Sequence, residues 1–146
     1  MKVRELMTPQ PTTVQPDATL GEVATLMKQQ DCGSIPVVEA GRLVGIVTDR
    51  DLVVRGIAAG VDPKTQSVSK VMSASPVTVS PDDDVTDAER KMADRQIRRL
   101  PVVEGGRLVG IIVTAQIARA GNERKVGERL KGISESRSAR GSHASG

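Results

Sequence analysis

The chain contains two copies of one segment, and this repeat restricts its possible folds more than any other feature of the sequence. Residues 3–53 align with residues 68–118 at an offset of 65, with 18 identities over 51 positions. The identities fall in the same order within three blocks, so a biased composition does not explain them. Two copies are too few for a solenoid, and we therefore expect them to pack on each other about a pseudo-two-fold axis.

Both copies are predicted to have the same order of elements, β-α-β-β-α, which places the chain in the α+β class. Apolar residues at helical spacing follow Thr19, which forms a capping-box pattern with Glu22, and Asp84 is the equivalent cap in copy two. Valine-rich runs on both sides of a short Gly turn predict a hairpin in each copy. The expected elements are extended pieces at 13–14 and 78–79, helices from 20 and from 85, strands at 35–38, 43–47, 100–103 and 108–112, and closing helices at 49–59 and 114–119.

The repeat also sets the expected domain boundaries: motif 1 over residues 1–59, a linker over 60–67, motif 2 over 68–120 and a tail over 121–146. Charge is unevenly divided, because residues 1–118 hold 14 basic and 15 acidic side chains whereas the remainder holds 7 and 3. The tail is basic and ends in a polar stretch rich in Ser and Gly, so we expect it to be disordered. The sequence does not predict a folded basic face of the kind that binds nucleic acid.

Composition excludes several classes of function. The chain has no Trp, Tyr or Phe, which rules out aromatic stacking platforms for single-stranded nucleic acid and aromatic cages for cations. One Cys and one His allow neither an internal disulfide nor a Cys/His metal cluster. No P-loop and no nucleophile–base set is recognisable, so we expect no catalytic residues and no enzyme activity. Because there is no membrane-length apolar run and no secretory signal, we expect a cytoplasmic protein without membrane contact.

Four stretches of the sequence resemble the tandem CBS domain pair, also called the Bateman module. They are VRELMTPQPTTVQPDATL, GSIPVVEAGRLVGIVTDRDLVVRGIAAGVDP, KVMSASPVTVSPDDDV and RQIRRLPVVEGGRLVGII, and they cover roughly residues 1–120. The TDRDLVVRG segment is similar to small stand-alone CBS-pair proteins of the hypoxic-response type. The resemblance implies a regulatory module that binds adenosine compounds (AMP, ADP, ATP, S-adenosylmethionine or NADH) between its motifs and forms homodimers through its helical faces.

The resemblance also implies a ribose site, for which the family pattern is Gly-h-h-(Ser/Thr)-x-x-Asp, with h an apolar residue. Copy one matches this pattern from Gly45 to Asp51, where the carboxylate would accept hydrogen bonds from both ribose hydroxyls. The residues taken alone favour another interpretation, in which Thr48 and Asp51 cap the helix that follows. Copy two has Val113 and Gln116 at the hydroxyl and carboxylate positions, so its site is expected to be empty or weak.

Three basic residues, Arg95, Arg98 and Arg99, lie at the expected corner between helix and strand of copy two, and copy one has no basic residue at the aligned positions. By resemblance, Arg98 and Arg99 reach across the pseudo-dyad to a phosphate group bound at the copy-one site. An alternative stays open, in which these arginines pair with Asp31, with Asp94 or with a dimer partner.

By resemblance, the adenine base would lie near Thr12, Thr13 and Val14 and near the backbone of Ile35 and Pro36. The sequence thus predicts a homodimeric regulatory module with one adenine-nucleotide site per chain, and AMP, ADP or ATP is expected ahead of S-adenosylmethionine or NADH. The alternative is a structural or protein-interaction dimer that has vestigial nucleotide sites and an unknown protein partner. Nucleic-acid binding through the basic tail is disfavoured.

Overall fold

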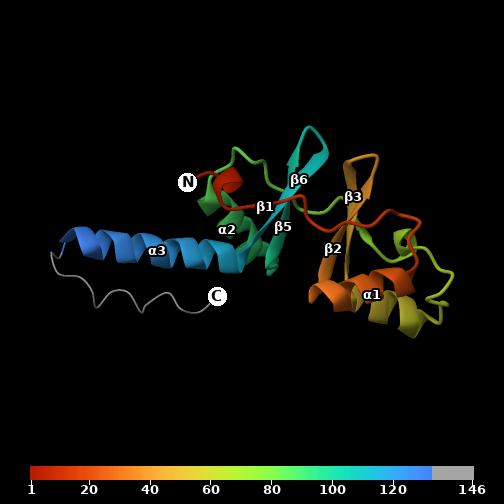
Figure 1. The fold of residues 1–146 in the computed structure, drawn as a ribbon. Coiled ribbons are helices and arrows are strands. Elements are labelled where there is room, and N and C mark those ends of the chain that lie inside the picture. The colour runs from red at the N-terminus through yellow and green to blue at the C-terminus, as the bar shows by residue number, and fades with distance from the viewer. Residues whose placement is uncertain (133–146) are drawn as a thin grey trace.

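The computed structural model describes residues 1–132, with side chains described as far as residue 123. It confirms the α+β class, and in Figure 1 the strands of the two copies lie between α1 and the pair α2 and α3. The elements of copy one are η1 (Val3–Glu5), β1 (Thr8–Pro9), α1 (Leu20–Gln30), β2 (Ser34–Glu39), β3 (Arg42–Thr48), the π-helix η2 (Asp51–Gly56) and η3 (Ile57–Ala59). Those of copy two are η4 (Val68–Lys70), β4 (Ser73–Ala74), α2 (Val85–Arg95), β5 (Arg99–Glu104), β6 (Arg107–Val113) and α3 (Thr114–Gly132).

Both predicted hairpins are present, and each turn places two successive residues at positive φ. Ala40 and Gly41 join β2 to β3 with φ of 53° and 82°, and Gly105 and Gly106 join β5 to β6 with φ of 60° and 83°. Two successive residues at positive φ match the right-handed twist of the strands. Three of the four turn residues are glycines, which adopt this conformation without steric cost, and Ala40 is the exception. The turn sequence therefore sets where each hairpin reverses.

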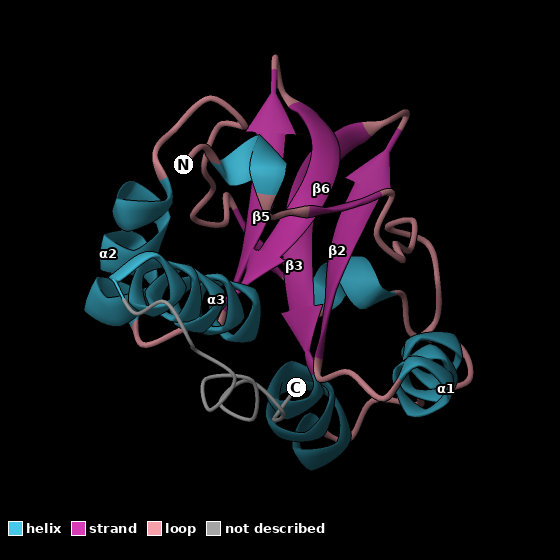
Figure 2. Cartoon of the chain, turned by 60° about the vertical axis from the view of Figure 1, so that its left-hand side comes forward, coloured by secondary structure: helices cyan, strands magenta, loops and turns pink. Residues whose placement is uncertain are grey.

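The two copies pack about a pseudo-two-fold axis, as the repeat predicts. β3 and β6 pair at Arg42 and Arg107, and the hydrogen bonds around this pair are reciprocal. The Leu43 amide donates to the Gly106 carbonyl at 3.2 Å, and the Leu108 amide donates to the Gly41 carbonyl at the same distance. Figure 2 shows the strands of both hairpins side by side. One sheet thus runs through both copies.

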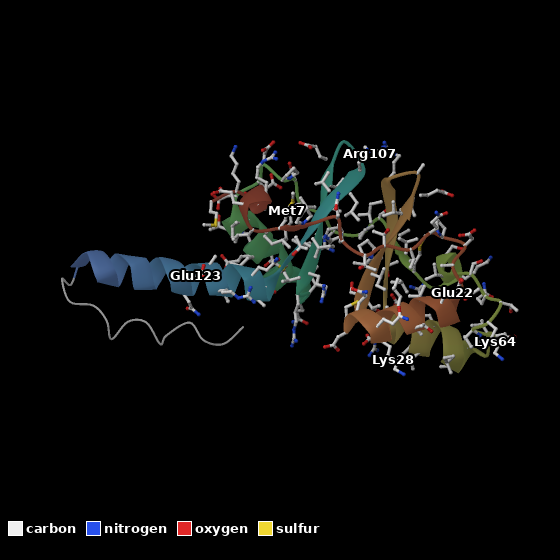
Figure 3. The ribbon with its side chains drawn as sticks, viewed as in Figure 1. Met7, Glu22, Lys28, Lys64, Arg107 and Glu123 are labelled. Atoms are coloured by element: carbon white, nitrogen blue, oxygen red, sulfur yellow. The ribbon has the colours of Figure 1, made fainter. Side chains whose placement is uncertain are left out.

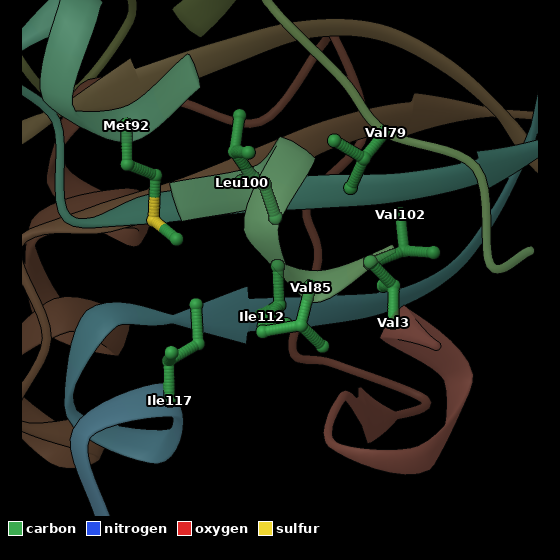
Figure 4. Close-up of a cluster of buried hydrophobic side chains, with 9 residues drawn as sticks. Val3, Val79, Val85, Met92, Leu100, Val102, Ile112 and Ile117 are labelled. Atoms are coloured by element: carbon green, nitrogen blue, oxygen red, sulfur yellow. The ribbon is translucent and has the colours of Figure 1, made fainter. Parts of the chain in front are cut away.

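The first segment of each copy completes the hydrophobic core of the other copy. β1 pairs with β6, and β4 pairs with β3. Val3, which has no exposed surface, belongs to the copy-two core together with Val85, Val102 and Ile112 (Figure 4). Its repeat partner Val68 is equally buried in the copy-one core. This exchange was not predicted from the sequence, and it joins the copies more tightly than a linker alone.

Each exchanged segment also places a methionine against a glycine of the opposite copy. Met7 of copy one packs against copy two (Figure 3), where a Cβ added to Gly110 would come within 2.7 Å of the Met7 sulfur. Met72 has the same relation to Gly45, at 2.6 Å. Real Cβ contacts are longer than this, so a side chain at either glycine would displace the segment. The glycine that begins the ribose pattern therefore has a packing role in both copies.

The predicted caps begin α1 and α2. The Glu22 amide donates to Thr19 Oγ1 at 3.2 Å while the Thr19 amide donates to Glu22 Oε1 at 2.8 Å, which is the reciprocal capping box. Asp84 caps α2 by accepting from the Thr86 amide at 2.9 Å. Both helices end at a residue in the left-handed region, Asp31 in copy one and Gln96 in copy two.

The closing helices differ from expectation. The helix expected over 114–119 continues to Gly132 as α3, so the expectation of disorder is corrected for residues 121–132, while residues 133–146 lie outside the described part of the chain. The helix continues because residues 115–132 are rich in Ala, Arg, Lys and Glu, which favour helix, and contain no proline. In copy one, residues 51–59 form a π-helix followed by a 3-10 turn.

In the described residues, no helix combines the length and the apolar character that a membrane span needs.

An ion pair ties the N-terminal segment to copy two and predicts a pH effect. Arg4 donates to Asp82 Oδ1 from Nη2 at 2.7 Å and from Nε at 3.2 Å. This hydrogen bonding, with the charge of Arg4, lowers the pKa of Asp82 in the folded chain. A carboxyl whose pKa is lower folded than unfolded stabilises the fold at neutral pH and loses this effect as the pH falls through the carboxyl range.

We therefore expect wild-type stability to fall more steeply than that of Asp82→Asn between roughly pH 5 and pH 3. Both side chains are exposed, so the difference should be small. Urea unfolding followed by circular dichroism at neutral and acidic pH measures it. Parallel pH profiles for the two proteins would show that the pair contributes nothing to stability.

Candidate functional site

A cleft of about 940 Å³ opens between the two copies, where β3 and β6 end and β2 and β5 begin. Its volume is in the range of small-molecule sites. Four pairs of repeat-related positions line it, and every pair differs in residue type, although 18 of the 51 aligned positions are identical. These pairs are Gly33 with Arg98, Ser34 with Arg99, Thr48 with Val113, and Asp49 with Thr114. The copies keep a common scaffold and diverge where they face this cleft.

The copy-two wall of the cleft carries three arginines. Arg95 and Arg98 are exposed and Arg99 is half-buried. Among the described residues, none of the three forms an ion pair, so the alternative of pairing with Asp31 or Asp94 does not occur within this part of the chain. Each guanidinium has five N–H donors in a planar fork that suits phosphate oxygens. The wall therefore presents donors and positive charge that no acidic side chain of the described residues neutralises.

The copy-one wall contains Thr48 and, one residue on, Asp49. Thr48 and Asp51 cap the following helix reciprocally: the Thr48 amide donates to Asp51 Oδ2 at 2.9 Å, and the Asp51 amide donates to Thr48 Oγ1 at 3.1 Å. The other carboxylate oxygen, Oδ1, lies 3.9 Å from Arg55 Nη1. Thr48 and Asp51 thus form the cap that the residues alone suggested, and Oδ1 of Asp51 keeps only the long ion pair with Arg55 among the described residues.

Gln116 takes a different role at the corresponding position of copy two. Its Oε1 accepts from the Val113 amide at 2.9 Å, which repeats the cap, but its Nε2 donates to Thr8 Oγ1 at 2.7 Å. Thr8 lies in β1, so this bond fastens the exchanged N-terminal segment to α3. Both ends of the amide are occupied, and the position offers no carboxylate to a ribose.

The residues expected around the base lie outside the lining of the cleft. Thr12 and Thr13 are exposed, while Ile35 is buried in the copy-one core. The Val14 amide donates to the Pro36 carbonyl at 3.1 Å, so these two backbone groups already bond each other. Of the nine predicted ligand-binding residues, the cleft brings together Thr48, Arg98 and Arg99, whereas Asp51 does not line it and is joined to it through its hydrogen bonds with Thr48.

Sequence reasoning missed Asp49 as a cleft residue. It occupies an unspecified position of the ribose pattern, and its Oδ1 accepts from the Arg50 amide at 2.7 Å. Pro76 and Val77, which follow β4, also line the cleft and were not singled out. The available signal was the difference between the copies, because Asp49 is acidic where copy two has Thr114.

In the part of the chain that the structure describes, no group of three His, Cys, Asp or Glu side chains is placed to hold a metal ion.

Comparison with known proteins assigns the family. The sequence matches the CBS domain twice, over residues 3–56 and 68–123. The chain belongs to the CBS domain family. Its CBS motifs coincide with the two copies of the repeat, so the chain is a CBS pair.

Two relatives show how the CBS pair compares with other chains of its size. It is 47% identical over 116 residues to the CBS domain-containing protein YhcV of Bacillus subtilis, covering 80% of this chain and 82% of the relative. It is 35% identical over 131 residues to hypoxic response protein 1 of Mycobacterium tuberculosis, covering 89% and 92%.

Solved structures of CBS pairs share the fold. A crystal structure of hypoxic response protein I with two coordinated zinc ions superposes with a TM-score of 0.76 at 35% identity, covering 82% of this chain and 98% of that one. CBSX2 in complex with AMP gives 0.75 at 28% identity, covering 85% and 98%. The CBS domain pair of MJ0100, in complex with 5-methylthioadenosine and S-adenosylmethionine, gives 0.71 at 25% identity, covering 83% and 99%.

Proposed function

We propose that this CBS pair is a regulatory module that binds an adenine nucleotide in the cleft between its motifs, with one site per chain and no catalytic step. The observation that carries the proposal is the wall of three arginines, which have no acidic partner among the described residues and face Thr48 and Asp49. An anionic ligand supplies the missing acceptors. The AMP bound by CBSX2 is such a ligand.

The two walls suggest how the nucleotide is oriented. Its phosphate accepts hydrogen bonds from Arg98 and Arg99, which line the cleft. Its ribose hydroxyls donate to Oδ1 of Asp51, which is hydrogen-bonded to the lining residue Thr48, and they displace the long contact with Arg55. The carboxylate retains its cap through Oδ2. The adenine points towards copy one, on the side of Thr12–Val14 and Ile35–Pro36.

The proposal of one site per chain rests on Gln116. Asp51 keeps one oxygen that a ribose can use, whereas the Gln116 amide is held by the Val113 amide and by Thr8. The arginine wall is also one-sided, because copy one has Gly33 and Ser34 where copy two has Arg98 and Arg99. Both differences favour the same nucleotide position.

A second candidate function is a structural or protein-interaction dimer whose nucleotide site is vestigial. The satisfied cap at Thr48 and Asp51 is compatible with it. So is the apolar surface of the helix after β3, where Val53, Val54 and Ile57 are about half exposed. The titration below separates the two candidates, because only the first requires a nucleotide to bind.

The test is calorimetric titration of wild type and Asp51→Asn with AMP, ADP, ATP, S-adenosylmethionine and NADH. Asparagine keeps an oxygen for the Thr48 amide but removes the charge, so the cap persists while the ribose contact weakens. We expect one nucleotide per chain for wild type and an affinity loss on the order of tenfold for the variant. In a dye-based melt, ligand at about a hundred times its Kd should raise the Tm by roughly 5–10 °C.

Asp62→Asn is the matched control, because Asp62 is exposed, accepts a local hydrogen bond from the Lys64 amide, and lies in the segment that joins the two copies. It should bind like wild type. Two equal sites per chain would overturn the inference from Gln116. Absence of binding by every adenine compound would overturn the nucleotide proposal and favour the interaction dimer.

A further inference from the structure

The cleft carries more positive charge than one phosphate contact requires. Of the described residues that line it, Arg95, Arg98 and Arg99 are basic and Asp49 is acidic, which leaves a net charge of +2. All three cations come from five consecutive residues on one wall. Like charges on one wall repel each other, and a bound anion relieves this repulsion.

The backbone fixes how these arginines are arranged. α2 ends at Arg95, and Gln96 turns the chain in the left-handed region with φ of 55°. Two residues later, the Arg98 carbonyl accepts from both the Thr114 amide, at 3.0 Å, and Thr114 Oγ1, at 3.2 Å. The corner is therefore held at both ends, and its side chains start from fixed positions.

The three arginines differ in exposure and in the element that carries them. Arg99 is half-buried and pairs with Val113 at the end of the sheet, as Ser34 pairs with Thr48 in copy one. Arg98 is exposed, and Arg95 lies on the last turn of α2, outside the sheet. Because Arg99 begins β5 and Arg95 ends α2, a chain of phosphates that leads from the strand ends towards α2 passes Arg99 and Arg98 first and reaches Arg95 last.

We propose that Arg95 contacts the second phosphate of the bound nucleotide, so that this chain selects nucleoside di- and triphosphates over monophosphates. The inference rests on the proposed function, that an adenine nucleotide occupies the cleft. It adds a residue that determines specificity and a ligand class defined by phosphate number.

Arg95 has a purely structural alternative, because a basic residue in the last turn of a helix stabilises the helix dipole. The two roles predict different measurements. A structural role changes the melting temperature without ligand and affects all nucleotides alike. A phosphate-reading role changes the ratio of affinities for AMP and ADP.

The test compares AMP, ADP and ATP binding to wild type, Arg95→Gln and Arg90→Gln by calorimetry. Glutamine is the residue that copy one has at the aligned position, Gln30, so the corner accommodates it. Arg90 is the control in the same helix, being exposed and paired with Asp87 at 3.2 Å. Titration with pyrophosphate and with phosphate tests the arginine wall without the nucleoside.

We expect wild type and Arg90→Gln to bind ADP and ATP about tenfold more tightly than AMP. Arg95→Gln should lose this preference while its AMP affinity changes by about twofold or less. Equal affinities of wild type for AMP and ADP, or equal losses for both in Arg95→Gln, would overturn the assignment and leave the proposed function standing. If pyrophosphate binds through Arg95 but no adenine nucleotide does, the proposed function fails and the phosphate site remains.

Discussion

Replacing Arg98 and Arg99 together with alanine is expected to lower the affinity for an adenine nucleotide on the order of 100-fold or more. Both guanidiniums line the cleft, and neither has an ion-pair partner in the described chain, so their donors are available to phosphate. Charge-assisted hydrogen bonds are about twice as strong as neutral ones. Calorimetric titration with the tightest-binding nucleotide measures the loss.

The double variant should fold as well as wild type, because removing two unpaired cations breaks no ion pair seen in the described residues. Arg90→Ala combined with Lys70→Ala is the matched control, since it removes the same charge from exposed positions outside the cleft. If the control loses affinity to the same extent, long-range charge rather than direct contact explains the effect. Unchanged affinity in Arg98→Ala/Arg99→Ala would remove the phosphate assignment.

Val3→Asp is expected to lower the free energy of unfolding by about 3 kcal/mol. Val3 is fully buried in the copy-two core, although it stands at the beginning of the copy-one sequence. A carboxylate there has no partner, and the core loses its apolar contact. Urea unfolding followed by circular dichroism is the suitable measurement, because the chain has no Trp or Tyr.

Gln10→Asp is the control for this variant, because it adds the same charge to an exposed position of the same N-terminal segment. Its unfolding free energy should change by about 0.5 kcal/mol or less. If Val3→Asp is as stable as this control, the exchanged segment does not contribute to the copy-two core in solution. Val68→Asp, the repeat-related change, should destabilise copy one in the same way.

Local elements were predictable because their signals are local. The capping box of Thr19 with Glu22 and the positive φ at the hairpin turns depend on neighbouring residues, and both are present. α3 is longer than the sequence analysis predicts, because the polar stretch after residue 120 is rich in Arg, Lys and Glu, which favour helix. This signal is also local.

Non-local pairings were not predictable in the same way. β1 and β4 are each two residues long and have no alternating pattern, and their partners lie in the other copy. Val3 is buried because of that pairing, and no periodic pattern in the neighbouring sequence indicates its burial. The bond from Gln116 to Thr8 spans 108 positions, so the loss of the copy-two carboxylate could be inferred from the sequence but the contact that replaces it could not.

The sequence by itself determined the family, the repeat, the hairpins and the difference between the copies at the cleft. These properties follow from which residues stand at which spacing along the chain. They therefore do not depend on how the two copies pack. Only the tertiary structure decided that each copy completes the other's core, that Thr48 and Asp49 face three arginines without acidic partners in the described chain, and that Gln116 is engaged by β1. Those relations join residues far apart in sequence, and packing about the pseudo-dyad is what brings them together.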